Sequence, residues 1–383
     1  MSKVLCIFGT RPEAIKLCPL VRRMAREPTL AVRVCVTAQH RAMLDQVLAA
    51  FQIRPDHDLN LMRADQTLVG STSRILGALE PVLLKEAPDL VVVQGDTTTT
   101  LCGALAAFYH RIPVAHVEAG LRTGDLHRPF PEEANRVLAT RLATLHFAAT
   151  ERAASNLLAE GVDPRRVWVT GNTVIDAVLY VARELEAGRL RGGDWSALDP
   201  ARKLVLVTAH RRESFGEGIE QICRALARLA LREDVQVVYP VHLNPNVRGP
   251  VERILAGRRN ILLIPPLDYV SFVDLMRRAY LVITDSGGIQ EEGPSLGKPI
   301  LVAREKTERP EAVEAGTALL VGAEEERIVQ AAEALLDDGR RQAEMARVHN
   351  PYGDGRACER ITSVILSFLT SNFSGLPAVH ASV

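Results

Sequence analysis

The stretch LVITDSGGIQEE, residues 281–292, joins an apolar β-branched run to a glycine-rich turn and the start of a helical pattern. Leu281–Thr284 has the composition of a strand buried on both faces, and Gly287 and Gly288 permit a tight turn. Ser286 and the glycines would expose backbone N–H groups where the helix begins, a position that favours an anion. We interpret this segment as a phosphate-binding strand–turn–helix; the plainer alternative is a glycine-rich turn without a ligand.

Similar apolar runs recur on both sides of this stretch and alternate with helical patterns such as 71–85. This alternation indicates parallel sheets covered on both faces by helices, an α/β fold. The alternation pauses at the charged segment 181–202. We therefore predict two Rossmann-like domains, residues 1–180 and 200–354. A helix over residues 355–372 could complete the first domain. The predicted strands are Lys3–Phe8, Val32–Val36, Leu90–Gln94, Pro113–Val117, Leu145–Ala148, Val167–Thr170, Leu204–Thr208, Val235–Tyr239, Ile261–Ile264, Leu281–Thr284 and Pro299–Val302.

Composition excludes several classes of protein. Lys plus Arg and Asp plus Glu both number 46 in 383 residues, so no net charge favours nucleic acid or an anionic membrane. No stretch reaches the roughly 18 apolar residues that span a bilayer, and the N-terminal run is interpreted as a buried strand rather than a signal peptide. The six cysteines are scattered, without a C-x-x-C pair. We therefore expect a cytoplasmic protein with reduced thiols, no structural metal, no nucleic-acid partner and no membrane partner.

Several carboxylates follow predicted strands. Ligands of open parallel sheets bind beyond the carboxyl ends of the strands, which makes polar residues there informative. Asp96 and Glu118 occupy such positions, and Glu132 and Glu133 begin the next helix. Crowded carboxylates raise one another's pKa and suit acid–base catalysis. Two alternatives stay open: Asp96 could cap a helix, and one of Glu132 and Glu133 could only complement the helix dipole.

Basic residues near other strand ends are candidates for binding an anion. Arg11 and Lys16 follow the first strand, and His210 ends the first strand of the second domain among arginines; each could instead be a solvated or structural residue. Arg309 could face the same anion as the 281–292 segment, and Glu292 could accept ribose hydroxyl groups. No G-x-G-x-x-G follows a strand, so we expect no dinucleotide cofactor, and phosphate charge is expected to be met by helix ends and arginines rather than an obligatory metal.

Ten segments carry a resemblance that covers nearly the whole chain. In order from residue 9 to residue 311 they read GTRPEAIK, QGDTTTT, HVEAGLRTGD, PEEANR, GNTVIDA, HRRE, PVHLNP, TDSGGIQEE, PSLGKP and TERPE. The chain resembles bacterial non-hydrolysing UDP-N-acetylglucosamine 2-epimerases. The resemblance implies the glycosyltransferase B type fold with a central cleft, a UDP site mainly on the second domain, and a homodimer. Ser214 stands where the family usually has Asn, and Leu267 where relatives often have Gln, which puts one uracil contact in doubt.

The resemblance also assigns roles to individual residues. It implies an acid–base set of Asp96, Glu118 and Glu132. It also implies that His210 is a nucleotide-sugar ligand, and we expect His210 to take part in catalysis as a donor to the departing phosphate. It implies UDP-sugar ligands at Arg11, Lys16, Arg136, Phe272, Ser286, Gly287, Gly288, Glu292 and Arg309. A regulatory second substrate site of the family falls on segments that contain Gln39, Gln46, Arg211 and His242.

These residues suggest a reaction without a cofactor. No carbonyl activates carbon 2 of the sugar, and the chain lacks the fingerprint of an NAD site, so we hypothesise that UDP is eliminated to give a 2-acetamidoglucal and is then re-added. The expected partners are UDP-N-acetylglucosamine, UDP-N-acetylmannosamine and UDP. The alternatives are a hydrolysing 2-epimerase, a 2-epimerase of a modified UDP-sugar, a glycosyltransferase of the same fold, and a non-catalytic nucleotide-sugar sensor.

Overall fold

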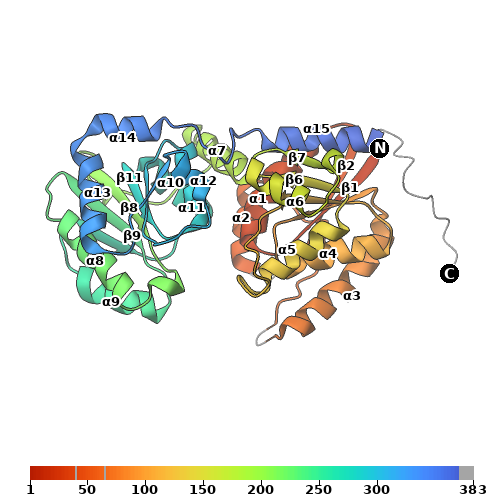
Figure 1. The fold of residues 1–383 in the computed structure, drawn as a ribbon, viewed down its shortest axis with the longest axis horizontal. Helices are drawn as coiled ribbons and strands as arrows, with labels where there is room; N and C mark the ends of the chain where they lie inside the picture. Colours follow the sequence, from red (N-terminus) through yellow and green to blue (C-terminus); the bar gives the residue numbers. More distant parts are fainter. Residues whose placement is uncertain (39–40, 64–65, 371–383) are drawn as a thin grey trace. The chain divides into compact units, whose positions relative to one another are not determined.

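The chain forms two compact units in the computed structural model, which describes residues 1–38, 41–63 and 66–370. The first unit contains Met1–Ala177 and the segment that begins at Gly355, and the second contains Val178–Asp354. Figure 1 shows the helices and strands of each unit.

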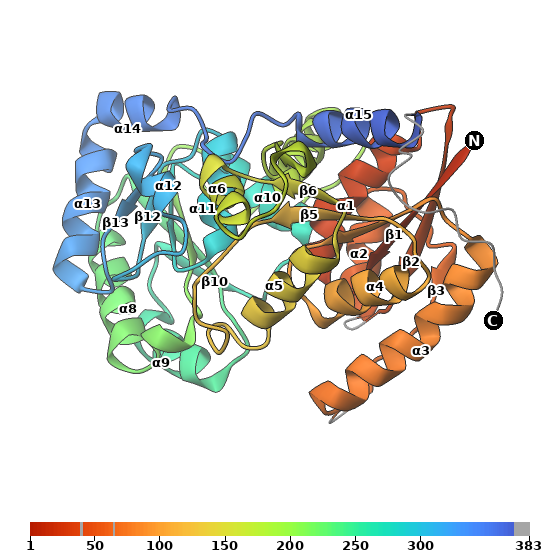
Figure 2. The same cartoon turned by 45° about the vertical axis from the view of Figure 1, so that its right-hand side comes forward.

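The first unit is built on a parallel sheet with the strand order β3-β2-β1-β4-β5-β6-β7 among the described residues. Helices α1, α2 and α15 cover one face, and α3, α4 and α5 cover the other (Figures 1 and 2). The strands are β1 Ser2–Phe8, β2 Leu30–Val36, β3 His57–Asp58, β4 Leu90–Gln94, β5 Val114–Ala119, β6 Leu145–Ala148 and β7 Val167–Val169. The helices are α1 Arg11–Met24, α2 Arg41–Ala50, α3 Leu68–Glu86, α4 Thr98–Tyr109, α5 Glu132–Leu142, α6 Glu151–Ala159, α7 Thr173–Glu186, which continues into the second unit, and α15 Ala357–Thr370.

The second unit repeats this architecture with the strand order β10-β9-β8-β11-β12-β13, again all parallel. Helices α8, α9 and α13 lie on one side of the sheet, and α10, α11 and α12 lie on the other (Figure 1). The strands are β8 Lys203–Thr208, β9 Val235–Pro240, β10 Ile261–Ile264, β11 Leu281–Thr284, β12 Ile300–Val302 and β13 Ala318–Leu320. The helices are α8 Glu217–Leu229, α9 Pro245–Leu255, α10 Tyr269–Arg278, α11 Gly287–Ser295, α12 Pro310–Glu314, α13 Glu325–Asp337 and α14 Gly339–Ala346.

The predicted α/β architecture with two parallel sheets is confirmed. Two strands were not predicted: β3, of two residues, and β13, of three, are too short to produce a recognisable apolar run. In each sheet the strand order reverses direction beside the first strand, between β1 and β4 and between β8 and β11. Such a reversal is a topological switch point, where connections diverge to opposite faces and leave room for a ligand at the carboxyl ends of the strands.

The sheet cores explain why the strand sequences are continuously apolar. Val4–Phe8 of β1 are fully buried, because α1 and α4 cover the two faces of the strand. In the second unit, Ile222 and Leu226 of α8 pack with Val205 and Val207 of β8 in one hydrophobic cluster. Burial of such side chains contributes about 1.5–3 kcal/mol each relative to exposure.

Helix α15 is fastened to the first unit at its N-terminus. The carboxylate of Asp176, on the first turn of α7, accepts hydrogen bonds from the backbone N–H groups of Ala357 at 3.1 Å and Cys358 at 3.0 Å. Helix α15 also packs against α1 (Figure 1). A segment that begins 181 residues after Asp176 thereby completes the same unit as α1 and β1.

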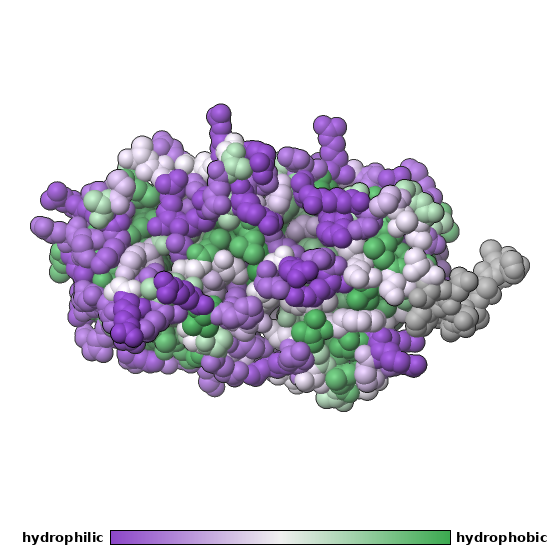
Figure 3. Space-filling view, turned by 90° about the horizontal axis from the view of Figure 1, so that it is seen from above, coloured by the Kyte–Doolittle hydropathy of each residue, from purple (hydrophilic) through white to green (hydrophobic). Residues whose placement is uncertain are grey.

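No helix among the residues that the structure describes has both the length and the apolar character to cross a membrane. On the face drawn in Figure 3, hydrophilic residues predominate and hydrophobic residues form small separate groups.

The turn after β5 requires glycine at position 120, which generates a prediction about stability. Gly120 has φ of +90°, and a Cβ there would lie 2.1 Å from the carbonyl oxygen of Ala153. We expect Gly120→Ala to lower the free energy of unfolding by more than about 2 kcal/mol. In Gly77→Ala the new methyl group meets nothing within 4 Å, so this helical control should gain about 0.5–1 kcal/mol. Urea unfolding curves measure both; equal midpoints for Gly120→Ala and the unchanged protein would contradict the steric argument.

Candidate active site

Three side chains from separate segments donate hydrogen bonds to the carboxylate of Glu118. The Lys16 ammonium lies 2.6 Å from both of its oxygens, the Asn172 amide donates to Oε1 at 3.0 Å, and the Gln94 amide donates to Oε2. Glu118 itself is buried and has φ of +62°, at a register shift between β5 and β6. A non-glycine residue in this strained conformation persists only when its surroundings fix it, as these donors do.

Asp96 follows β4 and lies beside a different cation. Its carboxylate is 3.0 Å from the guanidinium group of Arg136 on α5, and the Asn135 amide donates to its backbone carbonyl at 2.9 Å. Burial raises the pKa of Asp96 to about 6; Arg136 opposes this shift, and the negative charge of Glu118 adds to it. Asp96 can therefore exchange protons close to neutral pH, where a general acid or base is most effective.

The structure distinguishes Glu132 from Glu133. Glu133 is buried, and its carboxylate accepts the backbone N–H groups of Thr123 at 2.9 Å and Gly124 at 3.1 Å, so it holds the loop after β5. Glu132 is half-buried at the first position of α5, and its charge contributes to the raised pKa of Asp96. Of the two glutamates, Glu133 thus has a structural contact with the backbone, and Glu132 has an electrostatic effect on Asp96.

A buried carboxylate that sequence analysis did not single out connects the loops at the first switch point. Glu13 accepts the backbone N–H groups of Gly9 at 3.0 Å and Thr10 at 2.7 Å, and the Thr97 hydroxyl donates to it at 2.7 Å. Burial raises the pKa of Glu13, although these hydrogen bonds oppose the shift. The loop that precedes Arg11 is thereby bonded to the N-terminus of α4, the helix that follows Asp96.

In the second unit, a buried aspartate organises the loop after β8. One oxygen of Asp285 accepts the backbone N–H groups of both His210 and Arg211 at 2.7 Å. The His210 ring stacks on the ring of His242 with 5.2 Å between centroids, and burial lowers the pKa of His210. At neutral pH the ring is therefore uncharged and can act as a neutral hydrogen-bond donor. Sequence analysis assigned no role to Asp285.

Helix α11 begins at this second switch point without a side-chain cap. Ser286 is its N-cap residue but makes no capping hydrogen bond, and Gly287 and Gly288 form its first turn. A Cβ on Gly287 would lie 3.9 Å from the guanidinium carbon of Arg309. The positive charge of Arg309 is therefore next to the N-terminus of α11. Backbone N–H groups, the positive end of the helix dipole and an arginine together form the arrangement expected of a phosphate site.

The other predicted ligands of the second unit occupy neighbouring positions. Glu292, on α11, accepts the Tyr269 hydroxyl at 3.2 Å, and Arg309 pairs with Glu291. Phe272 is half-buried on α10, the helix that begins at Tyr269. In the first unit, the Arg11 guanidinium lies 4.0 Å from the sulfur of Met43.

The four residues of the implied regulatory site are distributed over both units. Gln39 lies outside the described residues, and Gln46 is exposed on α2 in the first unit. Arg211 and His242 belong to the loops after β8 and β9 in the second unit.

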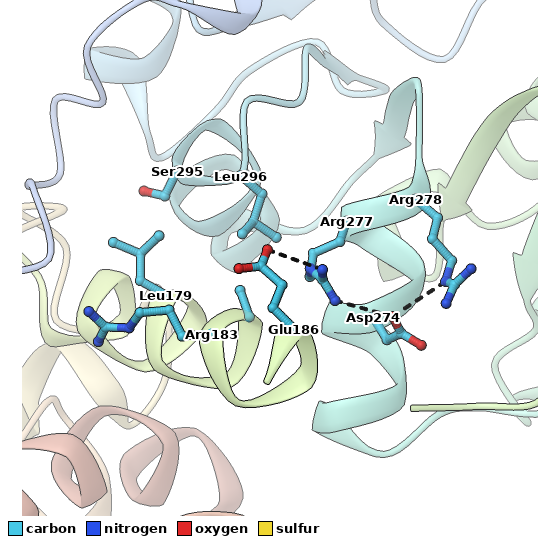
Figure 4. A pocket seen from close by; sticks show the side chains of 9 residues that line it. Leu179, Arg183, Glu186, Asp274, Arg277, Arg278, Ser295 and Leu296 are labelled. Carbon is cyan, nitrogen blue, oxygen red and sulfur yellow. Dashed lines mark hydrogen bonds and ion pairs between the residues drawn. The ribbon is translucent and has the colours of Figure 1, made fainter. Parts of the chain in front are cut away.

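A separate cavity of about 630 Å³ in the second unit contains none of the predicted site residues (Figure 4). Two of its arginines are paired: Arg277 lies 3.1 Å from Glu186 and 3.5 Å from Asp274, and Arg278 lies 3.3 Å from Asp274. Helix α10 ends at Arg278, just before β11 begins, so the cavity lies towards the amino ends of the strands, away from Ser286. No group of three or more His, Cys, Asp and Glu side chains in the described part of the chain is arranged to hold a metal ion.

Two parallel sheets that share one strand order, apart from the additional strand β7 of the first, are covered by helices and carry polar clusters at both switch points; they define an α/β enzyme of the glycosyltransferase B type fold. The family model described as UDP-N-acetylglucosamine 2-epimerase matches residues 22–366. This chain belongs to the UDP-N-acetylglucosamine 2-epimerase family, whose members are isomerases.

Individual relatives agree over nearly their full lengths. The UDP-N-acetylglucosamine 2-epimerase of Escherichia coli strain K12 is 57% identical over 368 residues, which cover 95% of this chain and 98% of that protein. The crystal structure of the Neisseria meningitidis UDP-GlcNAc 2-epimerase bound to UDP-GlcNAc has a TM-score of 0.87 and 47% identity, covering 95% of this chain and 100% of that one. A Staphylococcus aureus protein solved with UDP has a TM-score of 0.83 and 47% identity, covering all of both chains.

The charges around Asp96 generate a prediction about its titration. We expect its carboxyl signal, followed by NMR of ¹³C-labelled aspartate and assigned with Asp96→Asn, to titrate near pH 6. Glu118→Gln removes a neighbouring negative charge and should lower the pKa of Asp96, whereas Arg136→Gln removes a positive charge and should raise it. A midpoint near the ordinary 3.8 that neither substitution moves would contradict this account of the site.

Proposed function

We propose that this chain interconverts UDP-N-acetylglucosamine and UDP-N-acetylmannosamine without net hydrolysis, by elimination and re-addition of UDP. The observation that carries the proposal is the pair of unlike carboxylates at the carboxyl ends of β4 and β5. Asp96 has a pKa raised to about 6, and Glu118 is surrounded by donors. The bound UDP-GlcNAc and UDP of the related structures support the choice of substrate.

The reaction must invert carbon 2, which no adjacent carbonyl activates. In the proposed elimination, a carboxylate removes the carbon 2 proton, the C–H electron pair becomes the C1=C2 double bond, and the C1–O bond breaks with its electrons remaining on UDP. The intermediate is a 2-acetamidoglucal. Addition then delivers a proton to the opposite face of carbon 2, and UDP re-forms the bond to carbon 1, so the product has the composition of the substrate with the hydrogen on carbon 2 exchanged.

Departing UDP carries negative charge, which the second unit is suited to stabilise. The uncapped N-terminus of α11, with Ser286, Gly287 and Gly288, is proposed to bind the diphosphate, assisted by Arg309 and by a neutral His210 as a donor. Phe272 and Glu292 are proposed to contact uracil and ribose. In the first unit, Arg11 and Arg136 would contribute further positive charge to the same substrate.

Two of Asp96, Glu118 and Glu132 are proposed to exchange protons at carbon 2, with the third orienting the sugar or tuning the other two. Asp96 and Glu118 are the stronger pair because each has a defined charge partner, Arg136 for Asp96 and Lys16 for Glu118. Lys16, expected from the resemblance to be a substrate ligand, would act on substrate through Glu118 as well.

Assembly and regulation are further parts of the proposal. Helices α3, α4 and α5 pack side by side and expose Leu84, Phe108, Tyr109 and Leu138, a surface that supports a homodimer. The regulatory substrate site that the resemblance implies, with Gln46, Arg211 and His242 among the described residues, is proposed on the resemblance alone.

Asp96→Asn and Glu118→Gln should each lower kcat by at least about 100-fold, because each removes a group that transfers a proton. UDP affinity, measured by isothermal titration calorimetry, should stay close to that of the unchanged protein, since the phosphate ligands are intact. Glu151→Gln, which alters an exposed glutamate on α6 of the same unit, is the control and should leave kcat unchanged. Near-normal turnover in both carboxylate variants would remove the proposed acid–base role.

Product analysis in heavy water separates the proposed reaction from its rivals. We expect UDP-N-acetylglucosamine incubated with the protein to give UDP-N-acetylmannosamine with deuterium at carbon 2, observed by proton NMR. Accumulation of a reducing sugar would identify a hydrolysing 2-epimerase instead. Full retention of hydrogen at carbon 2 would exclude the elimination mechanism and favour a transferase, and turnover of only a modified UDP-sugar would reassign the substrate.

A further inference from the structure

The orientation of the Asn172 side-chain amide follows from two of its hydrogen bonds. Its Oδ1 accepts the backbone N–H of Val174 at 3.0 Å, in the first turn of α7. Because one end of the amide accepts a backbone N–H, the other end must be the donor, and Nδ2 donates to Glu118 Oε1 at 3.0 Å. The residue is buried, so this arrangement is set by packing and not by solvent.

Gln94 approaches the same carboxylate from another strand. It is the last residue of β4, it is buried, and its amide Nε2 donates to Glu118 Oε2. Its backbone carbonyl accepts the Thr100 hydroxyl at 2.6 Å, which anchors the strand end. The two amides therefore bond to different oxygens of Glu118, and together they restrict rotation of the carboxylate.

Other charged or titratable groups also face Glu118. Lys16 approaches from α1, and Asp96 lies near it after β4. His116 precedes it on β5, but burial lowers the pKa of His116 to about 4, so the ring is neutral at working pH. Lys16 compensates the negative charge of Glu118. The side-chain amides of Asn172 and Gln94 differ from it, because they are uncharged. They donate hydrogen bonds to Glu118 but cannot themselves accept the proton that a catalytic base removes.

We propose that Asn172 and Gln94 are positioning residues that hold Glu118 ionised and oriented as the acceptor of the carbon 2 proton. The inference rests on the proposed function, because it gives a task to the same carboxylate. Two neutral amides stabilise the ionised form over the protonated form through hydrogen bonding. They act through Glu118 and are assigned no contact with substrate.

The alternative is that Asn172 serves only to cap α7, and one substitution separates the two roles. Aspartate caps helices as well as asparagine does, so Asn172→Asp keeps the acceptor for Val174. It replaces the donor to Glu118 with a second carboxylate, and two carboxylates at this distance share a proton. A capping role predicts an active variant, and a positioning role predicts an impaired one.

The experiment measures kcat and KM for UDP-N-acetylglucosamine from pH 5 to pH 9 in Asn172→Asp, Asn172→Ser, Gln94→Glu and the unchanged protein. Thr67→Asp is the matched control, since it places a carboxylate at an exposed helix N-cap of the same unit. Asn172→Ser can still cap α7 but is too short to reach Glu118, and it decides the question if Asn172→Asp does not fold.

We expect Asn172→Asp and Gln94→Glu to lower kcat at neutral pH by about 100-fold, with a smaller change in KM. The acid limb of the kcat/KM profile should move up by about one pH unit or more, so that activity partly recovers in alkali. Asn172→Ser should lower kcat by about 10-fold with a smaller shift in the same direction, and Thr67→Asp should match the unchanged protein.

Two results would overturn the inference in distinguishable ways. If the unchanged protein epimerises its substrate and the Asn172 and Gln94 variants keep its kcat and its acid limb, the amides do not position Glu118 and the proposed function stands. If the unchanged protein does not epimerise UDP-N-acetylglucosamine, the proposed function fails, and the task assigned to the two amides fails with it.

Discussion

All strands of each sheet run parallel, and this constraint determines where chemistry can take place. The carboxyl ends of β1, β4 and β5 meet at one edge of the first sheet, so residues far apart in sequence are delivered to one small region. At that edge Glu13 bonds the loop after β1 to the start of α4. The same rule, applied to β8 and β11, brings His210 next to Asp285 in the second unit.

Neighbouring carboxylates in the first unit receive different electrostatic environments. Glu118 has an ammonium group and amide donors around it, which favour its ionised form. The carboxylate of Asp96 pairs with the guanidinium group of Arg136, and burial raises the pKa of Asp96 to about 6. Acid–base pairs require such a difference, because two identical carboxylates would compete for one proton instead of exchanging protons with a substrate.

Much of the fold could be predicted from the sequence because strands buried on both faces read as continuous apolar runs. Strands β3 and β13 could not, since two or three residues carry no pattern. Asp96, Glu118 and the α11 turn could be proposed as site residues from the sequence because they lie at or just beyond strand ends.

The amides around Glu118 were missed for a different reason. Gln94 ends β4 and Asn172 follows β7, and only the assembled sheet brings them to a residue on β5. Both are buried polar residues next to strand ends. Their position at strand ends was the feature of the sequence that could have identified them. Glu132 and Glu133 could not be separated by helix-dipole reasoning, which treats them alike; their burial and backbone contacts separate them.

The cap that Asp176 provides for α15 has a consequence for synthesis of the chain. The first unit is discontinuous, and the whole of Val178–Asp354 is translated before Ala357 and Cys358 can bond to Asp176. The second unit is thus an insertion that can fold on the ribosome while the first still lacks a helix against α1. The nascent chain can therefore complete its second unit before α15 closes the first.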